Sequence, residues 1–149
     1  MTVFEARQTG YADLTRGFLQ SMPVFRTLGL DIASVSPGRA EISMTITTGL
    51  TFDGTHVQGG IVGALLDIAG GAAAMTLTGE GHGIATLGFE THHLAPAGGE
   101  YLVAVGRVIK PGRNQALSLV EIFACHDASR SLCATGHVTS RWIALPDRG

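Results

Sequence analysis

The chain has 149 residues, of which 45% are hydrophobic and 15% charged, and its formal net charge at pH 7 is −2. This length suits a single domain with a sizeable core, here residues 1–149. The sequence pI of about 6.3 argues against a nucleic-acid-binding protein, which usually carries a basic face. Charged residues make up about a quarter of a typical domain, so their scarcity predicts that part of the surface is covered in a homo-oligomer.

The N-terminal third predicts a helix and then a β-hairpin. Residues 10–28 carry apolar side chains at helical spacing, interrupted by Pro23, which indicates a short helix followed by a turn. Residues 28–35 and 39–47 alternate between apolar and polar side chains. The Ser-Pro-Gly turn at 36–38 predicts that these two strands pair as a hairpin.

A long apolar segment at 59–79 follows a loop at 49–57 and approaches the length of a membrane span. It contains one acid, Asp67, and five glycines before Thr78, so a buried helix of a soluble protein is favoured over a membrane helix. A helix that is apolar on every side must be covered on every side. Strand-like runs complete the chain, four in number or three if one bends, at 83–96, 100–112, 114–127 and 131–145. This order predicts an α+β fold in which a curved antiparallel sheet surrounds the helix.

Two cysteines, Cys125 and Cys133, flank an expected turn and could face each other across a hairpin. The first ten residues lack the apolar core of a signal peptide. We therefore expect a cytoplasmic protein in which both thiols are reduced and buried.

Gly59 and Gly60 lie where the loop becomes the long helix. A helix N-terminus offers unsatisfied N–H groups and a partial positive charge, which suit the oxyanion that develops during acyl transfer. A simple tight turn is the alternative explanation for the two glycines.

Asp67 is a lone carboxylate on an otherwise apolar helix. It is either a structural acid satisfied by nearby hydroxyl or backbone groups, or an acid positioned as base or nucleophile in a cleft. Seven residues separate it from Gly60, so the two lie on nearly the same helix face but roughly 10 Å apart. One carbonyl needs both groups within about 3 Å, so any active site is predicted to form between two antiparallel subunits.

Other chemistry has little support in the sequence. The six histidines show no metal-ligand spacing, and His92 and His93 should point to opposite faces of a strand, so no metal site is expected. Ser118 and Ser131 lack the sequence context of a nucleophile elbow, which disfavours serine catalysis.

Four stretches between about Pro23 and Leu145 carry a family resemblance: PVFRTLGLDIASVSPGRAEISMTI, VQGGIVGALLDIAGGAA, TLGFETHHLAPA and VIKPGRNQALSLVEIFACHDASRSLCATGHV. In these stretches the chain resembles the hotdog-fold acyl-CoA thioesterases of the phenylacetate-pathway (PaaI-like) group. The resemblance implies a curved antiparallel sheet wrapped around one long central helix. It also implies hydrolysis of an acyl-CoA by a cytoplasmic homodimer or homotetramer, without a cofactor, because coenzyme A is part of the substrate.

The resemblance assigns roles to residues around the helix. The N–H of Gly59, with that of Gly60, would polarise the thioester carbonyl, and Asp67 of the other subunit would act as general base or nucleophile. Thr86 matches a hydroxyl that orients the water. Gln58 replaces the histidine that commonly precedes the glycine pair, and its amide can still hold substrate or backbone.

Phe52 departs from the family pattern, because many members have asparagine six residues before the histidine position. We therefore keep a second hypothesis, in which the protein binds an acyl-CoA or lipid-like ligand without hydrolysing it. A hotdog dehydratase or hydratase is less favoured, since those enzymes generally need a histidine beside an acid on the helix.

Cationic residues are absent between Arg39 and Arg107 and gather in the C-terminal third. Lys110 and Arg113 border a turn there, and the resemblance places the phosphates of coenzyme A near such cations. An ordinary solvated charged surface is the alternative.

Overall fold

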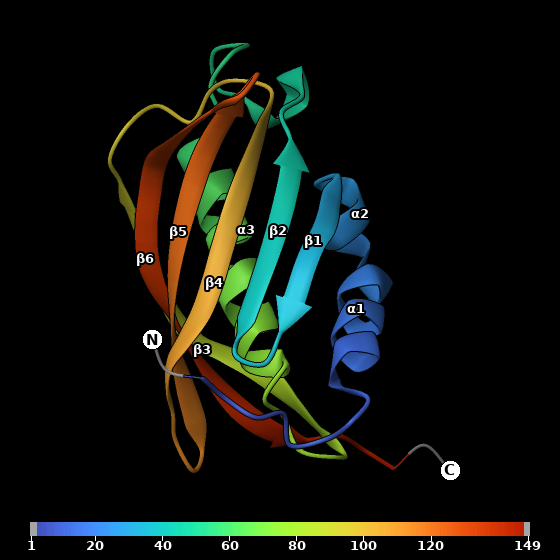
Figure 1. Ribbon diagram of the computed structural model, residues 1–149. Coiled ribbons are helices and arrows are strands. Elements are labelled where there is room, and N and C mark those ends of the chain that lie inside the picture. The colour runs from blue at the N-terminus through green and yellow to red at the C-terminus, as the bar shows by residue number, and fades with distance from the viewer. Residues whose placement is uncertain (1–2, 148–149) are drawn as a thin grey trace.

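A computed structural model describes residues 3–147 and contains one six-stranded antiparallel sheet and one long helix, with short helices at the N-terminal side (Figure 1). The strand order is β1-β2-β4-β5-β6-β3. The strands are β1 (Leu30–Ser36), β2 (Arg39–Thr45), β3 (His82–His93), β4 (Tyr101–Pro111), β5 (Gln115–His126) and β6 (Ser129–Ala144). The helices are α1 (Tyr11–Ser21), α2 (Pro23–Thr27), the 3-10 turn η1 (Thr48–Leu50) and α3 (Gly59–Met75). This is the predicted hotdog fold.

The sheet curves around α3, whose residues are mostly buried (Figure 1). Glycines allow the helix and the sheet to approach closely. A Cβ on Gly70 would overlap the side chain of Val138, and a Cβ on Gly106 would overlap the carbonyl of Ala69. The high glycine content of the helix therefore serves packing as well as the predicted site.

The N-terminal helix is interrupted where Pro23 predicts a turn. Met22 adopts an extended conformation (φ −73°, ψ 122°), because proline disfavours the helical conformation of the residue before it. Pro23 then occupies the first position of α2, where its missing N–H costs no helical hydrogen bond. The predicted turn is thus a single extended residue between two helices.

The prediction that Cys125 and Cys133 face each other is wrong. Cys125 pairs with Arg130 across the β5–β6 hairpin, and a register shift after Ile122 moves Cys133 out of line. Cys133 packs in the main core, whereas Cys125 packs in a second cluster with Val103. Both thiols are free and buried, as expected.

β3 lies at the edge of the sheet and pairs only with β6 among residues 3–147. Most of its side chains are exposed, including Leu87 and Phe89 at 56% and 51% exposure. An edge strand with free backbone groups and exposed apolar side chains is a template for pairing with another chain. None of the helices in the described part of the chain is long and apolar enough to span a membrane.

Candidate active site

Gln58 caps the N-terminus of α3. Its carbonyl accepts hydrogen bonds from the N–H groups of Ile61 at 2.9 Å and Val62 at 3.1 Å, and its side-chain Oε1 accepts from Ile61 at 3.1 Å. Within residues 3–147, the N–H groups of Gly59 and Gly60 have no acceptor. The cap therefore leaves open the two donors that the sequence singled out.

The tight-turn explanation for these glycines does not fit the structure. Gly59 and Gly60 are the first two residues of α3, and neither has a positive φ, so no backbone conformation demands glycine. Space gives a reason at position 60, where a Cβ would lie 2.9 Å from Oε1 of Gln58 and disturb the cap. A Cβ on Gly59 would lie 3.4 Å from Nε2 of His93, which is an ordinary contact and shows that this imidazole lies beside the helix end.

Asp67 is half-buried in the middle of α3, and the hydroxyl of Thr86 donates a hydrogen bond of 2.8 Å to its Oδ1. Burial raises the pKa of Asp67, and the hydrogen bond from Thr86 acts in the opposite direction with a smaller effect. Oδ2 receives no hydrogen bond from residues 3–147. One oxygen is therefore held in place while the other is free, as a general base or nucleophile requires.

An apolar pocket of about 200 Å³ lies next to Asp67 and Thr86. It runs between α1, α3 and β3, and its remaining walls are Phe18, Leu19, Met22, Ile68, Gly71, Ala72, Met75 and Ile84. An apolar cavity of about 150 Å³ can hold a benzene ring. The pocket can therefore receive an aromatic ring or a short aliphatic chain beside the acid.

Phe52 lies in the loop before α3 and is 70% exposed. Its ring stacks on that of His56 with 6.2 Å between centroids, and its N–H donates to the His56 carbonyl. Nδ1 of His56 lies 2.6 Å from Oδ2 of Asp53. This contact and the hydrogen bonds from the N–H groups of His56 and Thr55 lower the pKa of Asp53 to about 2. Phe52 thus belongs to a compact loop with its own hydrogen-bond network.

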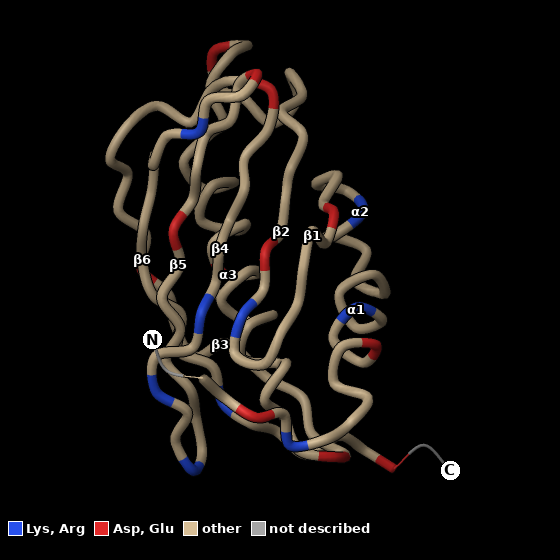
Figure 2. Tube along the Cα trace, in the orientation of Figure 1, with Lys and Arg blue, Asp and Glu red and all other residues tan. Residues whose placement is uncertain are grey.

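Lys110 and Arg113 are exposed where β4 turns into β5, and the lysines and arginines of the sheet lie mostly toward this end (Figure 2). The neighbouring Pro111 lies in the same cross-strand row as Thr86, through β5 and β6. Three strand spacings separate them, about 14 Å across the sheet. Within one chain, these cations flank the row of Thr86 without lying next to Asp67.

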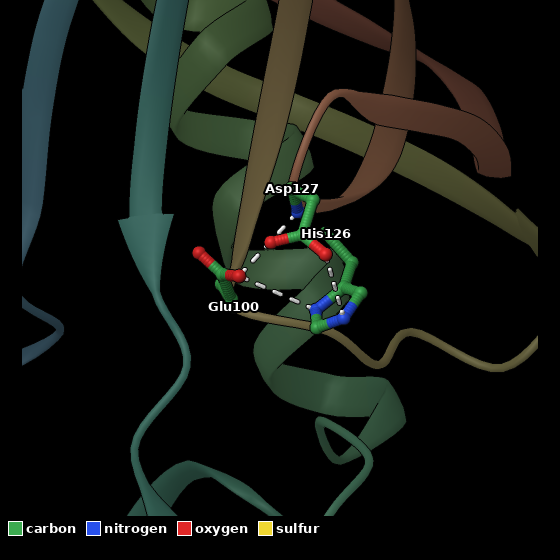
Figure 3. Close-up of side chains that lie close together, drawn as sticks. All are labelled: Glu100, His126 and Asp127. Carbon is green, nitrogen blue, oxygen red and sulfur yellow. Dashed lines mark hydrogen bonds and ion pairs between the residues drawn. The ribbon is translucent and has the colours of Figure 1, made fainter.

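The sequence shows no metal-ligand spacing around His126, yet the fold brings it between two carboxylates (Figure 3). Its Nδ1 lies 3.4 Å from Oε1 of Glu100, and its Nε2 lies 3.5 Å from Oδ2 of Asp127. All three side chains are exposed, and ordinary surface ion pairs account for their contacts. The cluster contains none of the predicted site residues.

His93 is the one neighbour of the glycine end that the sequence did not assign to the site. It ends β3, and the distance from Gly59 brings its imidazole beside the start of α3. His92 instead lies 3.7 Å from the carboxylate of Glu90. The alternation of strand faces predicts that the two histidines separate, but only the fold shows which of them meets the helix.

Comparisons with known proteins agree with this fold. Residues 54–139 match the family model of the thioesterase superfamily. A thioesterase family protein of Silicibacter pomeroyi is 34% identical, with a TM-score of 0.87 over 91% of this chain and 99% of that one. A thioesterase of Haemophilus influenzae shares the fold at 22% identity (TM-score 0.82, over 97% and 99% of the two chains). The PaaI protein of the Escherichia coli phenylacetic acid degradation operon also shares the fold, at 21% identity, with a TM-score of 0.79 over 93% of this chain and 99% of that one. A search of curated proteins found no significant match.

Proposed function

Because the chain belongs to the thioesterase superfamily, we propose that it hydrolyses the thioester of an acyl-CoA to a free carboxylic acid and coenzyme A. The observation that carries this proposal is the contact between Thr86 and Asp67 at the wall of an apolar pocket. It combines an oriented acid, whose burial raises its pKa, with space for an acyl group. No cofactor takes part in the proposed reaction.

In the proposed mechanism, the N–H groups of Gly59 and Gly60 hold the thioester carbonyl at the start of α3. Asp67 either removes a proton from the attacking water, which Thr86 helps to orient, or attacks the carbonyl carbon itself and is released by water. Either route passes through a tetrahedral oxyanion, which the positive end of the helix and the open N–H groups stabilise. The C–S bond then breaks, and coenzyme A leaves as the thiolate.

The active site is proposed to form between two subunits. Gly60 and Asp67 are seven residues apart on a continuous helix, roughly 10 Å, so they cannot both reach one carbonyl from the same chain. The exposed edge strand β3, with the apolar side chains Leu87 and Phe89, supports a homodimer formed edge to edge. Such a dimer would bring the glycine end of one chain toward the Asp67 of the other.

The two ends of the substrate have separate proposed positions. The acyl group would enter the pocket between α1 and α3 beside Asp67, because apolar side chains form most of its wall. The phosphates of coenzyme A would bind near Lys110 and Arg113, which are exposed and carry no ion pair with another described residue. The pocket volume favours aromatic or short acyl groups over long fatty chains.

Binding without hydrolysis remains the second candidate function. Two features favour it: Phe52 is apolar where the family resemblance implies a polar residue, and the Gln58 amide oxygen caps its own helix. In a pure binding protein the pocket would hold the acyl group while the carbonyl stayed intact.

A thiol-release assay with acyl-CoAs of varied chain length and aromaticity separates the two functions. We expect wild-type turnover on short or aromatic substrates and a loss of at least about a hundredfold in Asp67→Asn, as for removal of a general base. Asp31→Asn, at an exposed acid on β1, is the matched control and should keep wild-type turnover. Tight binding of acyl-CoAs without any thiol release would establish the binding function instead.

A further inference from the structure

The inner face of β3 lines the first half of α3. A Cβ on Gly63 would contact Phe89 and Thr91 at 3.5 Å, and a Cβ on Gly59 would lie 3.4 Å from Nε2 and 3.5 Å from Cε1 of His93. These three β3 residues alternate along the strand, so they share the face that meets the helix. His93 is the last of them and lies at the helix N-terminus.

The imidazole of His93 has no polar partner within residues 3–147, although it is exposed enough to meet a ligand. The other five histidines of the chain all have one. Their partners are Asp53 for His56, the Glu80 carbonyl for His82, Glu90 for His92 and His137, and Glu100 with Asp127 for His126. Within residues 3–147, His93 is thus the one histidine with no polar partner at either ring nitrogen, and it lies beside the open N–H groups of α3.

We infer that His93 is a further catalytic residue, which donates a hydrogen bond from Nε2 to the thioester carbonyl oxygen beside the N–H of Gly59. This inference rests on the proposed function. Phe52 is apolar and supplies no donor there, and the Gln58 side chain is held against its own helix through Oε1. An imidazole N–H is a suitable oxyanion donor, and no proton needs to leave the ring during the reaction.

Two inhibitors test this role without relying on turnover. One is a trifluoromethyl ketone analogue of a short acyl-CoA, whose tetrahedral hydrate mimics the intermediate. The other is the S-alkyl-CoA thioether of the same length, which has no carbonyl. His93→Ala should weaken binding of the ketone about tenfold or more relative to wild type and leave binding of the thioether unchanged. A residue that merely packs against the helix would affect both inhibitors alike.

His92→Ala is the matched control, because His92 lies on the opposite face of the same strand end and should affect neither inhibitor. His93→Gln retains a side-chain donor and should recover part of the ketone affinity. In turnover, His93→Ala should lower kcat about ten- to a hundredfold with little change in KM, since the interaction strengthens in the transition state.

Equal weakening of both inhibitors, or of neither, in His93→Ala overturns the inference. If wild type binds the ketone in a His93-dependent way but releases no thiol, the carbonyl contact stands and the hydrolytic function fails. If wild type releases thiol and His93→Ala keeps the wild-type preference for the ketone over the thioether, the function stands and the role of His93 fails. If wild type does not bind the ketone, the role of His93 fails, and if it also releases no thiol, both are wrong.

Discussion

Gly59→Pro removes one proposed oxyanion donor with little disturbance of the helix. Gln58 has φ −63° and ψ 139°, the extended conformation that residues before proline prefer. Gly59 is the first residue of α3, where proline is well tolerated, and its N–H makes no hydrogen bond within residues 3–147. The substitution therefore sacrifices no hydrogen bond of the folded chain and deletes only the proposed contact with substrate.

We expect Gly59→Pro to reduce kcat by about 10²–10³, or about 2.7–4 kcal/mol, the usual effect of losing one preorganised oxyanion donor. Gly59→Ala is the matched control. It keeps the N–H, and its Cβ would make an ordinary contact of 3.4 Å with the His93 ring, so its loss should be much smaller. Thiol release and a thermal melt of each variant check both statements. Wild-type turnover in a folded Gly59→Pro protein would refute the assignment of this N–H.

Mixing Gly59→Pro with Asp67→Asn then tests whether the site is shared between subunits. In a symmetric dimer, one site of each mixed dimer carries both defects and the other carries neither. Random exchange of equal amounts makes half the dimers mixed, so about a quarter of wild-type activity should return. Continued inactivity after verified subunit exchange would mean that the glycines and Asp67 do not meet across a dimer interface.

Three further expectations concern stability and substrate binding. Burial raises the pKa of Asp67 in the folded chain above its unfolded-state value of 3.8, so wild type loses stability as the pH rises from 3.8 through the folded-state pKa. Asp67→Asn should therefore melt at a higher temperature than wild type at pH 7. This difference in melting temperature should disappear below pH 3.8. Gly70→Ala should lower the free energy of unfolding by about 1–3 kcal/mol in urea titrations, because its Cβ would overlap Val138. Lys110→Ala with Arg113→Ala should raise KM for acyl-CoAs and preserve kcat, and an equal effect on a short thioester without the nucleotide would show that these cations are ordinary surface charge.

The sequence predicts the elements of this fold well, because its local patterns are strong. The helix at 59–79 is detected from continuous apolar character, and only its end moves, to Met75. The hairpin of β1 and β2 follows from alternation and a Pro-Gly turn. Cross-strand partners are harder to predict from the sequence, because one bulge after Ile122 changes the register and separates Cys125 from Cys133. A bulge depends on how the two strands twist around the helix, which no local pattern encodes.

The sequence likewise predicts some residues of the candidate site, whereas other features of the site depend on the fold. Asp67 stands out because an acid is rare on an apolar helix. The family resemblance assigns Thr86 to the site, but only the fold shows its hydrogen bond to Asp67. The pocket is assembled from α1, α3 and β3, so its volume depends on tertiary packing alone. His93 is similar: strand alternation separates it from His92, but its approach to Gly59 depends on how β3 crosses the helix.

The fold explains why Asp67 is accessible on a helix that is otherwise mostly buried. A helix enclosed by a sheet can present functional groups only at its N-terminus and along the side that faces the open sheet edge. β3 forms that edge, and it supplies Thr86 to the acid and His93 to the helix N-terminus. The same enclosure that stabilises the core removes water from Asp67 and raises its pKa. A raised pKa implies that ionised Asp67 costs folding free energy at neutral pH, and the proposed role in catalysis gives a reason for retaining it there.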